Sequence, residues 1–222
     1  MPNHLSSGIK GVGIGLRLPH IDELLATRPA IPWLEALSDN YLTAGSVHQE
    51  YLIEVAEHYP LTLHGVGMSL GASDALDRGY LAQLKSLINK IKPALVSDHV
   101  CWTGAHGWVS HDLLPLPYNE ETLQHVANRI RQVQDYLERP IMIENISSYL
   151  QYQHTTMSEW TFVAALAEAA DCHILLDVNN IYVNAFNHQF DPQVFLAAMP
   201  SHRVKQIHLA GYEHKGTHLL DT

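Results

Sequence analysis

Short apolar runs that each end on polar residues recur along the whole chain. Six of them are LEALSDN from Leu34, LTLHG from Leu61, ALVSDH from Ala94, IMIEN from Ile141, ILLDVNN from Ile174 and IHLAG from Ile207. Segments with apolar residues at helical spacing stand between these runs. Strand-like and helix-like segments that alternate in this way predict parallel βα units, with the runs as buried strands.

The pattern predicts seven such units. We expect strands over residues 12–16, 33–37, 61–65, 94–99, 140–145, 173–178 and 204–209. We expect helices near residues 20–27, 46–58, 74–91 and 120–138, from 157 with a capping box of Thr156 and Glu159, and after Asp191-Pro192. The long loop 104–118 carries His106, Trp108 and His111, and its aromatic residues favour a lid.

Parallel βα units of this kind predict an α/β fold, a TIM (β/α)8-type barrel that forms a single domain over residues 1–222. An eight-stranded barrel needs eight units, and the eighth is missing after Thr222. We therefore expect the chain to be a shortened form of a protein of about 250 residues or more. We also expect Asp221 to be poorly ordered, because terminal residues fray unless they are tied down.

Composition narrows the range of partners. The chain has 13 basic and 23 acidic residues, a net charge of −10, which argues against a nucleic-acid surface built from clustered Lys and Arg. The segment MPNHLSSGIK lacks the pattern of a signal peptide, and no apolar run is long enough to span a membrane. The two cysteines, Cys101 and Cys172, are expected to be reduced and buried, as in a cytoplasmic protein.

The strand ends carry candidate metal ligands. Catalytic groups of such barrels come from the C-terminal ends of several strands. The candidates at these ends are His64, His99, Glu144, Asp177, Asn180 and His208. Asp98 precedes His99, and since only one of two neighbours on a strand can face the mouth, we choose His99 as ligand and Asp98 as a second-shell group or proton acceptor.

Each candidate has a structural alternative. His64 could be satisfied by a backbone carbonyl, and Asp177 could cap the turn that follows it. Glu144 closes an apolar strand, where a carboxylate is costly unless it is paired or binds a metal. Mixed imidazole and carboxylate ligands suit iron, zinc or manganese. One ion cannot use six or more ligands spread around a barrel mouth, so we expect two or more ions. Glu144 is the natural bridge between them.

Other polar residues at the strand ends are candidates for substrate binding. Glu35, Asp39 and Asn40 could bind substrate or could simply end the second strand. Asn145 and Asn179 lie beside the ligand candidates and are further candidates for substrate contact.

Several stretches together resemble the methanobactin-biosynthesis MbnB-like family of multinuclear iron enzymes, long catalogued as a family of unknown function. They are HGVGMSLG from His64, SDHVCW from Ser97, HDLLPLPY from His111, IENISSYL from Ile143, LLDVNNIYVNAFNHQFDP from Leu175 and IHLAG from Ile207. The resemblance implies a xylose-isomerase-like barrel that holds two or three irons. It also implies use of oxygen to modify cysteines of a ribosomally made precursor peptide, which a small partner protein presents.

The resemblance also implies an assignment of ligands. His64, His99 and Glu144 would form one iron site, Glu144, Asp177 and His208 a second, and Asn180 with Asp221 part of a third. The pattern is similar to that of endonuclease IV-type nucleases with three zinc ions, in which a histidine stands at the position of Asn180. The chain departs from the family at Tyr212, where many members have histidine. It also ends before a further histidine and before a glutamate of the eighth strand.

The leading hypothesis is an iron-dependent oxidase of peptide cysteine, with Asp98 as the base near the thiolate. A metal-dependent phosphodiesterase is the second hypothesis, because two metals can clamp the attacking and leaving oxygens. A sugar isomerase is the third hypothesis. It is weakened because the strand-end motifs contain no lysine. An inactive barrel that only binds a peptide or partner is the non-enzymatic alternative.

Overall fold

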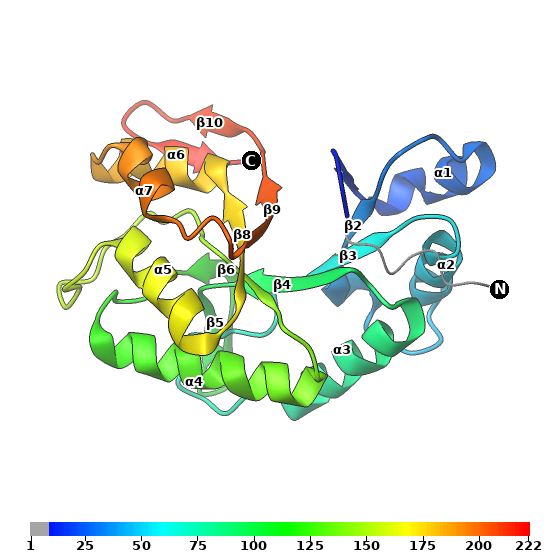
Figure 1. The fold of residues 1–222 in the computed structure, drawn as a ribbon, viewed down its shortest axis with the longest axis horizontal. Coiled ribbons are helices and arrows are strands. Elements are labelled where there is room, and N and C mark those ends of the chain that lie inside the picture. Colours follow the sequence, from blue (N-terminus) through cyan, green and yellow to red (C-terminus); the bar gives the residue numbers. More distant parts are fainter. Residues whose placement is uncertain (1–8) are drawn as a thin grey trace. The chain divides into compact units, whose positions relative to one another are not determined.

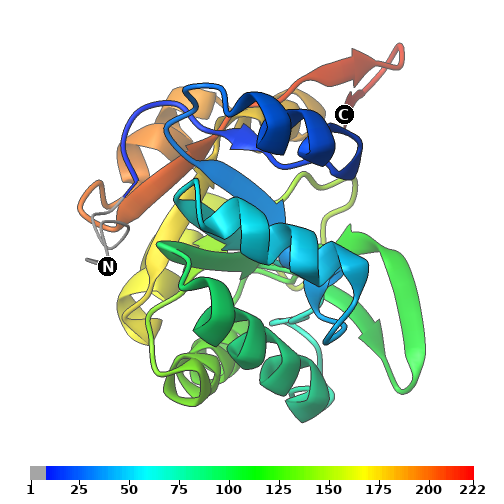
Figure 2. The same ribbon diagram turned by 90° about the vertical axis from the view of Figure 1, so that its right-hand side faces the viewer.

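The computed structural model describes residues 9–222, so most of the segment in which we looked for a signal peptide lies outside the described residues. The chain forms two compact units, and each is described here by itself. The first unit consists of Met1–Met68 and Asp77–Ser97, and the second of Ser69–Leu76 and Asp98–Thr222. Figure 1 labels the elements, and Figure 2 shows the same ribbon after a quarter turn.

The first unit contains four parallel strands and the helices between them. Its elements are β1 (Ile14–Gly15), η1 (Leu18–His20), α1 (Ile21–Thr27), β2 (Leu34–Leu37), η2 (Ser38–Tyr41), α2 (Val47–Ala56), β3 (Leu61–His64), α3 (Arg78–Ile91) and the start of β4 (Leu95–His99). Leu34 pairs with Leu61, and His64 pairs with Ser97. These pairings place the ends of β2, β3 and β4 at one edge of the sheet.

The second unit contains the end of β4, three further parallel strands and two antiparallel hairpins. Its elements are β5 (Trp102–Ala105), β6 (Trp108–Leu114), α4 (Glu120–Leu137), β7 (Met142–Glu144), α5 (Glu159–Ala170), β8 (His173–Asp177), α6 (Val178–His188), α7 (Pro192–Ala198), β9 (Val204–His208), β10 (Tyr212–His214) and β11 (Leu219–Asp221). Glu144 pairs with Leu175, and Asp177 pairs with His208.

The parallel strands follow the order β1-β2-β3-β4-β7-β8-β9, and β4 is shared by the two units. Each strand therefore lies beside the next parallel strand of the chain, as in a (β/α) barrel. The predicted α/β barrel class is confirmed, and residues 9–222 contain the seven parallel strands that the sequence predicts. A single domain over the whole chain stays a prediction.

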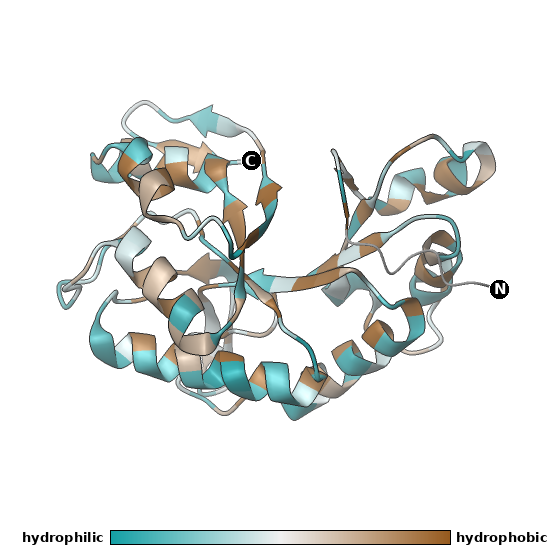
Figure 3. Cartoon of the chain, in the orientation of Figure 1, coloured by the Kyte–Doolittle hydropathy of each residue, from teal (hydrophilic) through white to brown (hydrophobic). Residues whose placement is uncertain are grey.

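Helix α4 shows how the apolar pattern produces the core. Its buried residues include Leu123, Val126, Ile130, Val133 and Leu137, the stripe that the spacing predicts. Asn119 caps its first turn by accepting a hydrogen bond from the backbone N–H of Thr122 at 2.9 Å. Figure 3 shows hydrophobic and hydrophilic residues alternating around this helix, while β8 is hydrophobic between its polar ends, His173 and Asp177.

Several local predictions are wrong. The segment expected to be an irregular loop forms the hairpin β5–β6, whose two-residue turn has positive φ at His106 (53°) and Gly107 (81°). Ser158, rather than Thr156, caps α5. Helix α6 was not predicted at all. By contrast, Asp191 caps α7 with Pro192 in its first turn, as the sequence predicts.

The predicted disorder of Asp221 is also wrong. The residue lies in β11, opposite Tyr212 of β10, and its carboxylate accepts a hydrogen bond from Asn179 at 2.6 Å. These two contacts supply the ties that a frayed end would lack. None of the helices in residues 9–222 combines the length and the apolar character that a membrane crossing requires.

Candidate metal centre

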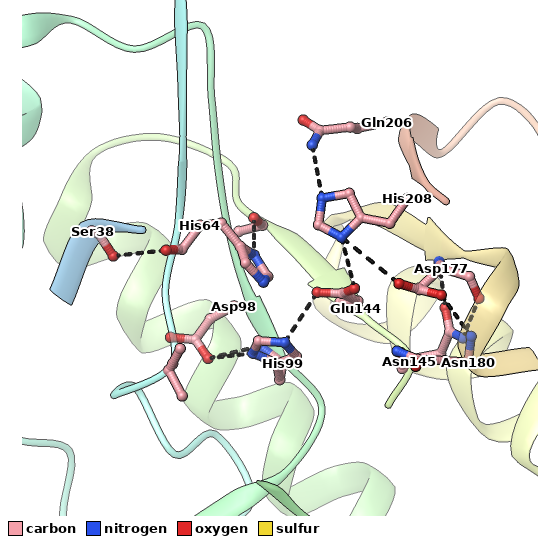
Figure 4. A network of polar contacts seen from close by, with 12 residues as sticks. Ser38, His64, Asp98, His99, Glu144, Asn145, Asp177, Asn180, Gln206 and His208 are labelled. Atoms are coloured by element: carbon pink, nitrogen blue, oxygen red, sulfur yellow. Dashed lines mark hydrogen bonds and ion pairs between the residues drawn. The ribbon is translucent and has the colours of Figure 1, made fainter. Parts of the chain in front are cut away.

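Three acidic and imidazole side chains meet at the C-terminal ends of β7, β8 and β9 in the second unit. Glu144, Asp177 and His208 each offer one ligand atom, and these atoms lie within 4.8 Å of one another. The strands are parallel and adjacent, so their ends come to the same edge of the sheet. Figure 4 shows the three side chains turned toward one another.

Glu144 is the central residue of this cluster. Its Oε1 lies 3.1 Å from Nδ1 of His208, and its Oε2 lies 3.2 Å from Nε2 of His99. The carboxylate is almost completely buried, with 2% of the residue exposed. Two oxygens that face two different histidines give the geometry of a carboxylate that could bridge two ions.

Asp177 serves both the fold and the cluster. Its Oδ1 accepts a hydrogen bond from the backbone N–H of Asn180 at 2.6 Å and so caps α6, while Oδ2 lies 3.8 Å from Nδ1 of His208. Asp177 can therefore cap α6 and be a metal ligand at the same time, because the cap uses Oδ1 and the ligand position uses Oδ2.

Burial raises the pKa of Asp177 to about 6, the hydrogen bond from Asn180 opposes this rise, and the nearby Glu144 carboxylate adds to it. Two carboxylates held this close, with little water around them, repel each other unless a cation lies between them. The donor set of imidazole and carboxylate is one that iron, zinc or manganese can use. The residues therefore fit a metal ion.

The remaining nitrogen of the His208 ring is held by Gln206. Nε2 of His208 lies 3.2 Å from Nε2 of Gln206, two residues earlier on β9 and therefore on the same side of the strand. With this amide N–H as donor, the ring proton resides on Nδ1 and is donated to Glu144. When Nδ1 binds a metal instead, the proton must reside on Nε2, and a half-turn of the Gln206 amide brings its oxygen there to accept it.

His64 belongs to the first unit, where Ser97 sets its tautomer. When the Ser97 hydroxyl donates to the carbonyl oxygen of Leu63 at 3.3 Å, it accepts at its 2.8 Å contact with Nδ1 of His64. The ring proton is then on Nδ1 and the lone pair on Nε2, the form that a metal ligand requires. The predicted site of His64 with His99 and Glu144 stays a prediction.

Asp98 is fully buried beside the ligand candidate His99. Its Oδ1 accepts a hydrogen bond from the backbone N–H of His99 at 2.7 Å and lies 3.8 Å from Nδ1 of the ring. These contacts hold the backbone from which His99 projects, and the role of Asp98 as proton acceptor stays a prediction.

Two asparagines predicted to bind substrate have their amides engaged with the protein. Asn145 donates to the carbonyl of Asp177 at 2.9 Å and accepts from its N–H at 3.0 Å, which joins the ends of β7 and β8. Asn179 donates to the carbonyl of Gly211 and to Asp221. Binding of substrate by Asn145 and Asn179 stays a prediction.

Asn180 differs from these two because part of its amide lacks a partner. Its Nδ2 donates to the carbonyl of Asn145 at 3.0 Å, whereas its buried Oδ1 has no hydrogen-bond partner within the described part of the chain. A buried acceptor without a donor is costly, and a cation can satisfy it. This agrees with the predicted role of Asn180 as a ligand, which the structure leaves as a prediction together with that of Asp221.

The predicted substrate residues of the first unit separate into two groups. Asp39 accepts hydrogen bonds from the N–H of Val66 and the hydroxyl of Tyr80, so it holds the segment after β3. Glu35 accepts from Thr62 at 3.4 Å, and Asn40 is exposed on η2. Binding of substrate by Glu35 and Asn40 stays a prediction.

The sequence alone did not identify Ser97 and Gln206 as partners of the histidines. A weak signal existed for Gln206, because it stands two residues before His208 on a strand and is polar at a position that the core would otherwise fill with an apolar residue. Ser97 gave no such signal, since its contact is made across two strands.

The fold and the cluster together define a barrel-type protein with candidate metal-binding residues. Residues 11–222 match the model of the RiPP precursor modification enzymes MbnB/TglH/ChrH, whose substrates are ribosomally made precursor peptides, and the chain belongs to this family.

Curated relatives of the chain carry the name UPF0276 protein. One from Acaryochloris marina is 54% identical over 216 residues, which cover 97% of this chain and 78% of that protein. One from Anaeromyxobacter is 50% identical over 212 residues, covering 96% and 75% of the two chains.

Solved structures support the fold at low sequence identity. The endonuclease IV of Thermus thermophilus matches with a TM-score of 0.57 and 15% identity, over 90% of this chain and 76% of that one. A 3-keto-D-glucoside 4-epimerase from E. coli matches with a TM-score of 0.57 and 12% identity, over 90% of this chain and 78% of that one. A fusion protein with a xylose isomerase-like TIM barrel matches with a TM-score of 0.55 and 14% identity, over 90% of this chain and 31% of that one.

Proposed function

We propose that this protein is an iron-dependent oxidase that modifies cysteine residues of a ribosomally made precursor peptide with O2. Membership of the precursor-modifying family supports the peptide substrate. The buried carboxylate of Glu144, with a histidine at each of its oxygens, is the observation that carries the metal-dependent part.

The ligands of the proposed iron site in the second unit are Glu144, Asp177 and His208. His99 faces the other oxygen of Glu144, and His64 is its predicted companion at a further ion. Asn180 and Asp221 are the predicted ligands of a third. Zinc and manganese accept the same donors, so the choice of iron rests on the resemblance to the MbnB-like family.

Bound ferrous iron would supply a binding position for the substrate thiolate and the electrons that reduce oxygen. The protein's own residues prepare the site for this. Gln206 contacts Nε2 of His208, Ser97 contacts Nδ1 of His64, and Asp98 holds the backbone of His99. Asp98 is also our predicted base for the thiol proton.

The proposed enzyme acts with a small partner protein that presents the peptide, and in the cytoplasm. We propose neither a nucleic acid nor a membrane as its partner, because the net charge of −10 disfavours phosphate binding.

The test is incubation of the protein with ferrous iron, O2 and a cysteine-containing precursor peptide, with and without the candidate partner protein, followed by mass spectrometry of the peptide. We expect a change in peptide mass that requires both iron and O2 and that is lost in Glu144→Gln. Cleavage of DNA at abasic sites, with no mass change in any candidate peptide, would instead show a metal-dependent hydrolase.

A further inference from the structure

A cavity of about 210 Å³ lies in the second unit, away from the cluster around Glu144. It lies between the segment after β6, the segment between β7 and α5, and the end of α6. Six of its lining residues carry an aromatic ring, an imidazole or a thioether: Tyr118, Tyr152, Met157, Trp160, His188 and Phe190. Aromatic faces of this kind attract cations as well as apolar groups.

A buried carboxyl group also lines the cavity. Glu159 is the first residue of α5, and its Oε2 accepts a hydrogen bond from Nδ2 of Asn184 at 3.0 Å. The hydroxyl of Tyr118 donates a second hydrogen bond to this carboxyl. Within residues 9–222, no lysine, arginine or histidine forms an ion pair with Glu159. Burial raises the pKa of Glu159 to about 8, although both hydrogen bonds oppose the rise.

The neighbours of Glu159 hold it in one orientation. Asn184 is completely buried, and its Oδ1 accepts a hydrogen bond from the backbone N–H of Ser148 at 2.7 Å. The amide therefore has to turn its NH2 group toward Glu159. The Ser148 hydroxyl lies 2.9 Å from Nε2 of His188, which closes the network at the cavity wall. The carboxyl group is thus positioned before any ligand arrives.

Hydrogen bonding alone would not need a carboxyl group at this position. A glutamine could accept the hydrogen bond from Asn184 and contact the Tyr118 hydroxyl without any cost of burying a charge. A buried carboxylate is costly unless a cation pairs with it. Residues 9–222 supply no such cation in an ion pair with Glu159, but the cavity beside Glu159 can admit one.

We propose that this cavity binds the ammonium group of a lysine side chain of the precursor peptide, paired with Glu159 and enclosed by the aromatic residues. The peptide as the source of the lysine rests on the proposed function. Lysine suits the site better than arginine, because Asn184 and Tyr118 already donate hydrogen bonds to the carboxyl group. A guanidinium pairs best with both oxygens, whereas an ammonium acts as a compact point charge.

The experiment is an NMR titration of the metal-free protein with Nα-acetyl-lysine-N-methylamide. A ligand of this size that fills one pocket binds with a Kd of roughly millimolar. We expect shifts confined to the residues around the cavity, and an affinity at least about tenfold lower for the same compound acetylated at Nζ, because acetylation removes the charge. Equal binding of the two compounds, or binding of neither, would overturn the proposal.

Variants and a second ligand sharpen the test. Glu159→Gln keeps the hydrogen bonds and should weaken lysine binding at least about tenfold, the loss expected for a buried charge pair. Glu121→Gln, an exposed change on α4, should leave binding unaltered. Unchanged binding in a folded Glu159→Gln protein would contradict the proposal. Binding of n-butylammonium without binding of the lysine derivative would show a site for free amines and would exclude the peptide.

Neither metal nor cysteine takes part in this titration. A failure here therefore leaves the proposed oxidase function standing, and a failure of the oxidase assay leaves the lysine site standing as a property of the cavity.

Discussion

Nδ1 of His208 lies 3.1 Å from Oε1 of Glu144, although 64 positions of the chain separate the two residues. They end different strands, β9 and β7, with β8 between them in the sheet. The contact therefore depends on the parallel order of the strands and on no local turn. The hydrogen bond holds both groups near the positions in which they would bind an ion.

Replacement of Glu144 by glutamine should release metal from the second unit. Glutamine has the same shape, but it removes the negative charge and one acceptor, so we expect affinity for ferrous iron to fall at least about a hundredfold. Titration with iron under anaerobic conditions measures this. Glu121→Gln, with the same chemical change on the exposed face of α4, is the control and should bind iron like the parent. Equal affinity in both variants would show that Glu144 is not a ligand.

Gln206 should control the affinity of His208 for metal. Gln206→Leu removes the acceptor for the Nε2 proton, and loss of such a partner typically costs about 10- to 100-fold in metal affinity. Gln206→Glu provides a permanent acceptor and should restore affinity to the parent value or above. Loss in both variants alike would mean that position 206 only fills space.

Ser97 should fix the tautomer of His64 even when no metal is present. In the unmodified protein, nitrogen NMR of the His64 ring should show a proton on Nδ1 and none on Nε2, because the Ser97 hydroxyl accepts from Nδ1. Ser97→Ala removes that acceptor, so we expect a substantial population with the proton on Nε2. An unchanged spectrum in Ser97→Ala would show that another group sets the tautomer.

Glu159 should make folding less favourable as pH rises. The pKa of Glu159 is raised by burial to about 8 in the folded protein, above its ordinary value of 4.5. The folded state therefore retains the proton that the unfolded state loses, and stability falls between about pH 4.5 and 8, by up to about 1.4 kcal/mol per pH unit. Below this window the contribution is fully present.

The matched variant for this prediction is Glu159→Gln, which has no proton to lose. Denaturant unfolding at several pH values should give a free energy of unfolding that declines less steeply with pH for the variant than for the parent. The same slope for the two proteins would mean that Glu159 titrates near its ordinary pKa.

The strand ends could be predicted from the sequence because each buried strand is a continuous apolar run and its end is marked by a polar residue. Glu144 and His208 could therefore be placed at one edge of the sheet without a structure. Asp177 was harder to interpret, since a strand end that is also a helix cap uses the same residue for both tasks.

Helix α6 was missed for a related reason. It begins directly after β8 without an intervening loop, and its sequence VNNIYVNAFNH contains many asparagines and β-branched residues, which have low helix propensity. Asn180 and Asn184 lie one turn apart and donate to the carbonyls of Asn145 and Ile146, so contacts with the loop after β7 support the helix. Such contacts are invisible in a local pattern.

The hairpin β5–β6 could have been found. The pair His106-Gly107 between two strands fits a two-residue turn with positive φ at both positions, in which Gly is strongly favoured at the second. The cavity beside Glu159 could not have been predicted from the sequence, because its walls come from three segments that the sequence gives no reason to bring together.

The metal content of the protein after anaerobic purification, with the Mössbauer spectrum of the bound iron, tests the central claim most directly. We predict bound ferrous iron that is lost in Glu144→Gln and His208→Ala but retained in His48→Ala, whose histidine is exposed on α2. Stoichiometric zinc without iron, or iron that all three variants retain equally, would contradict the account.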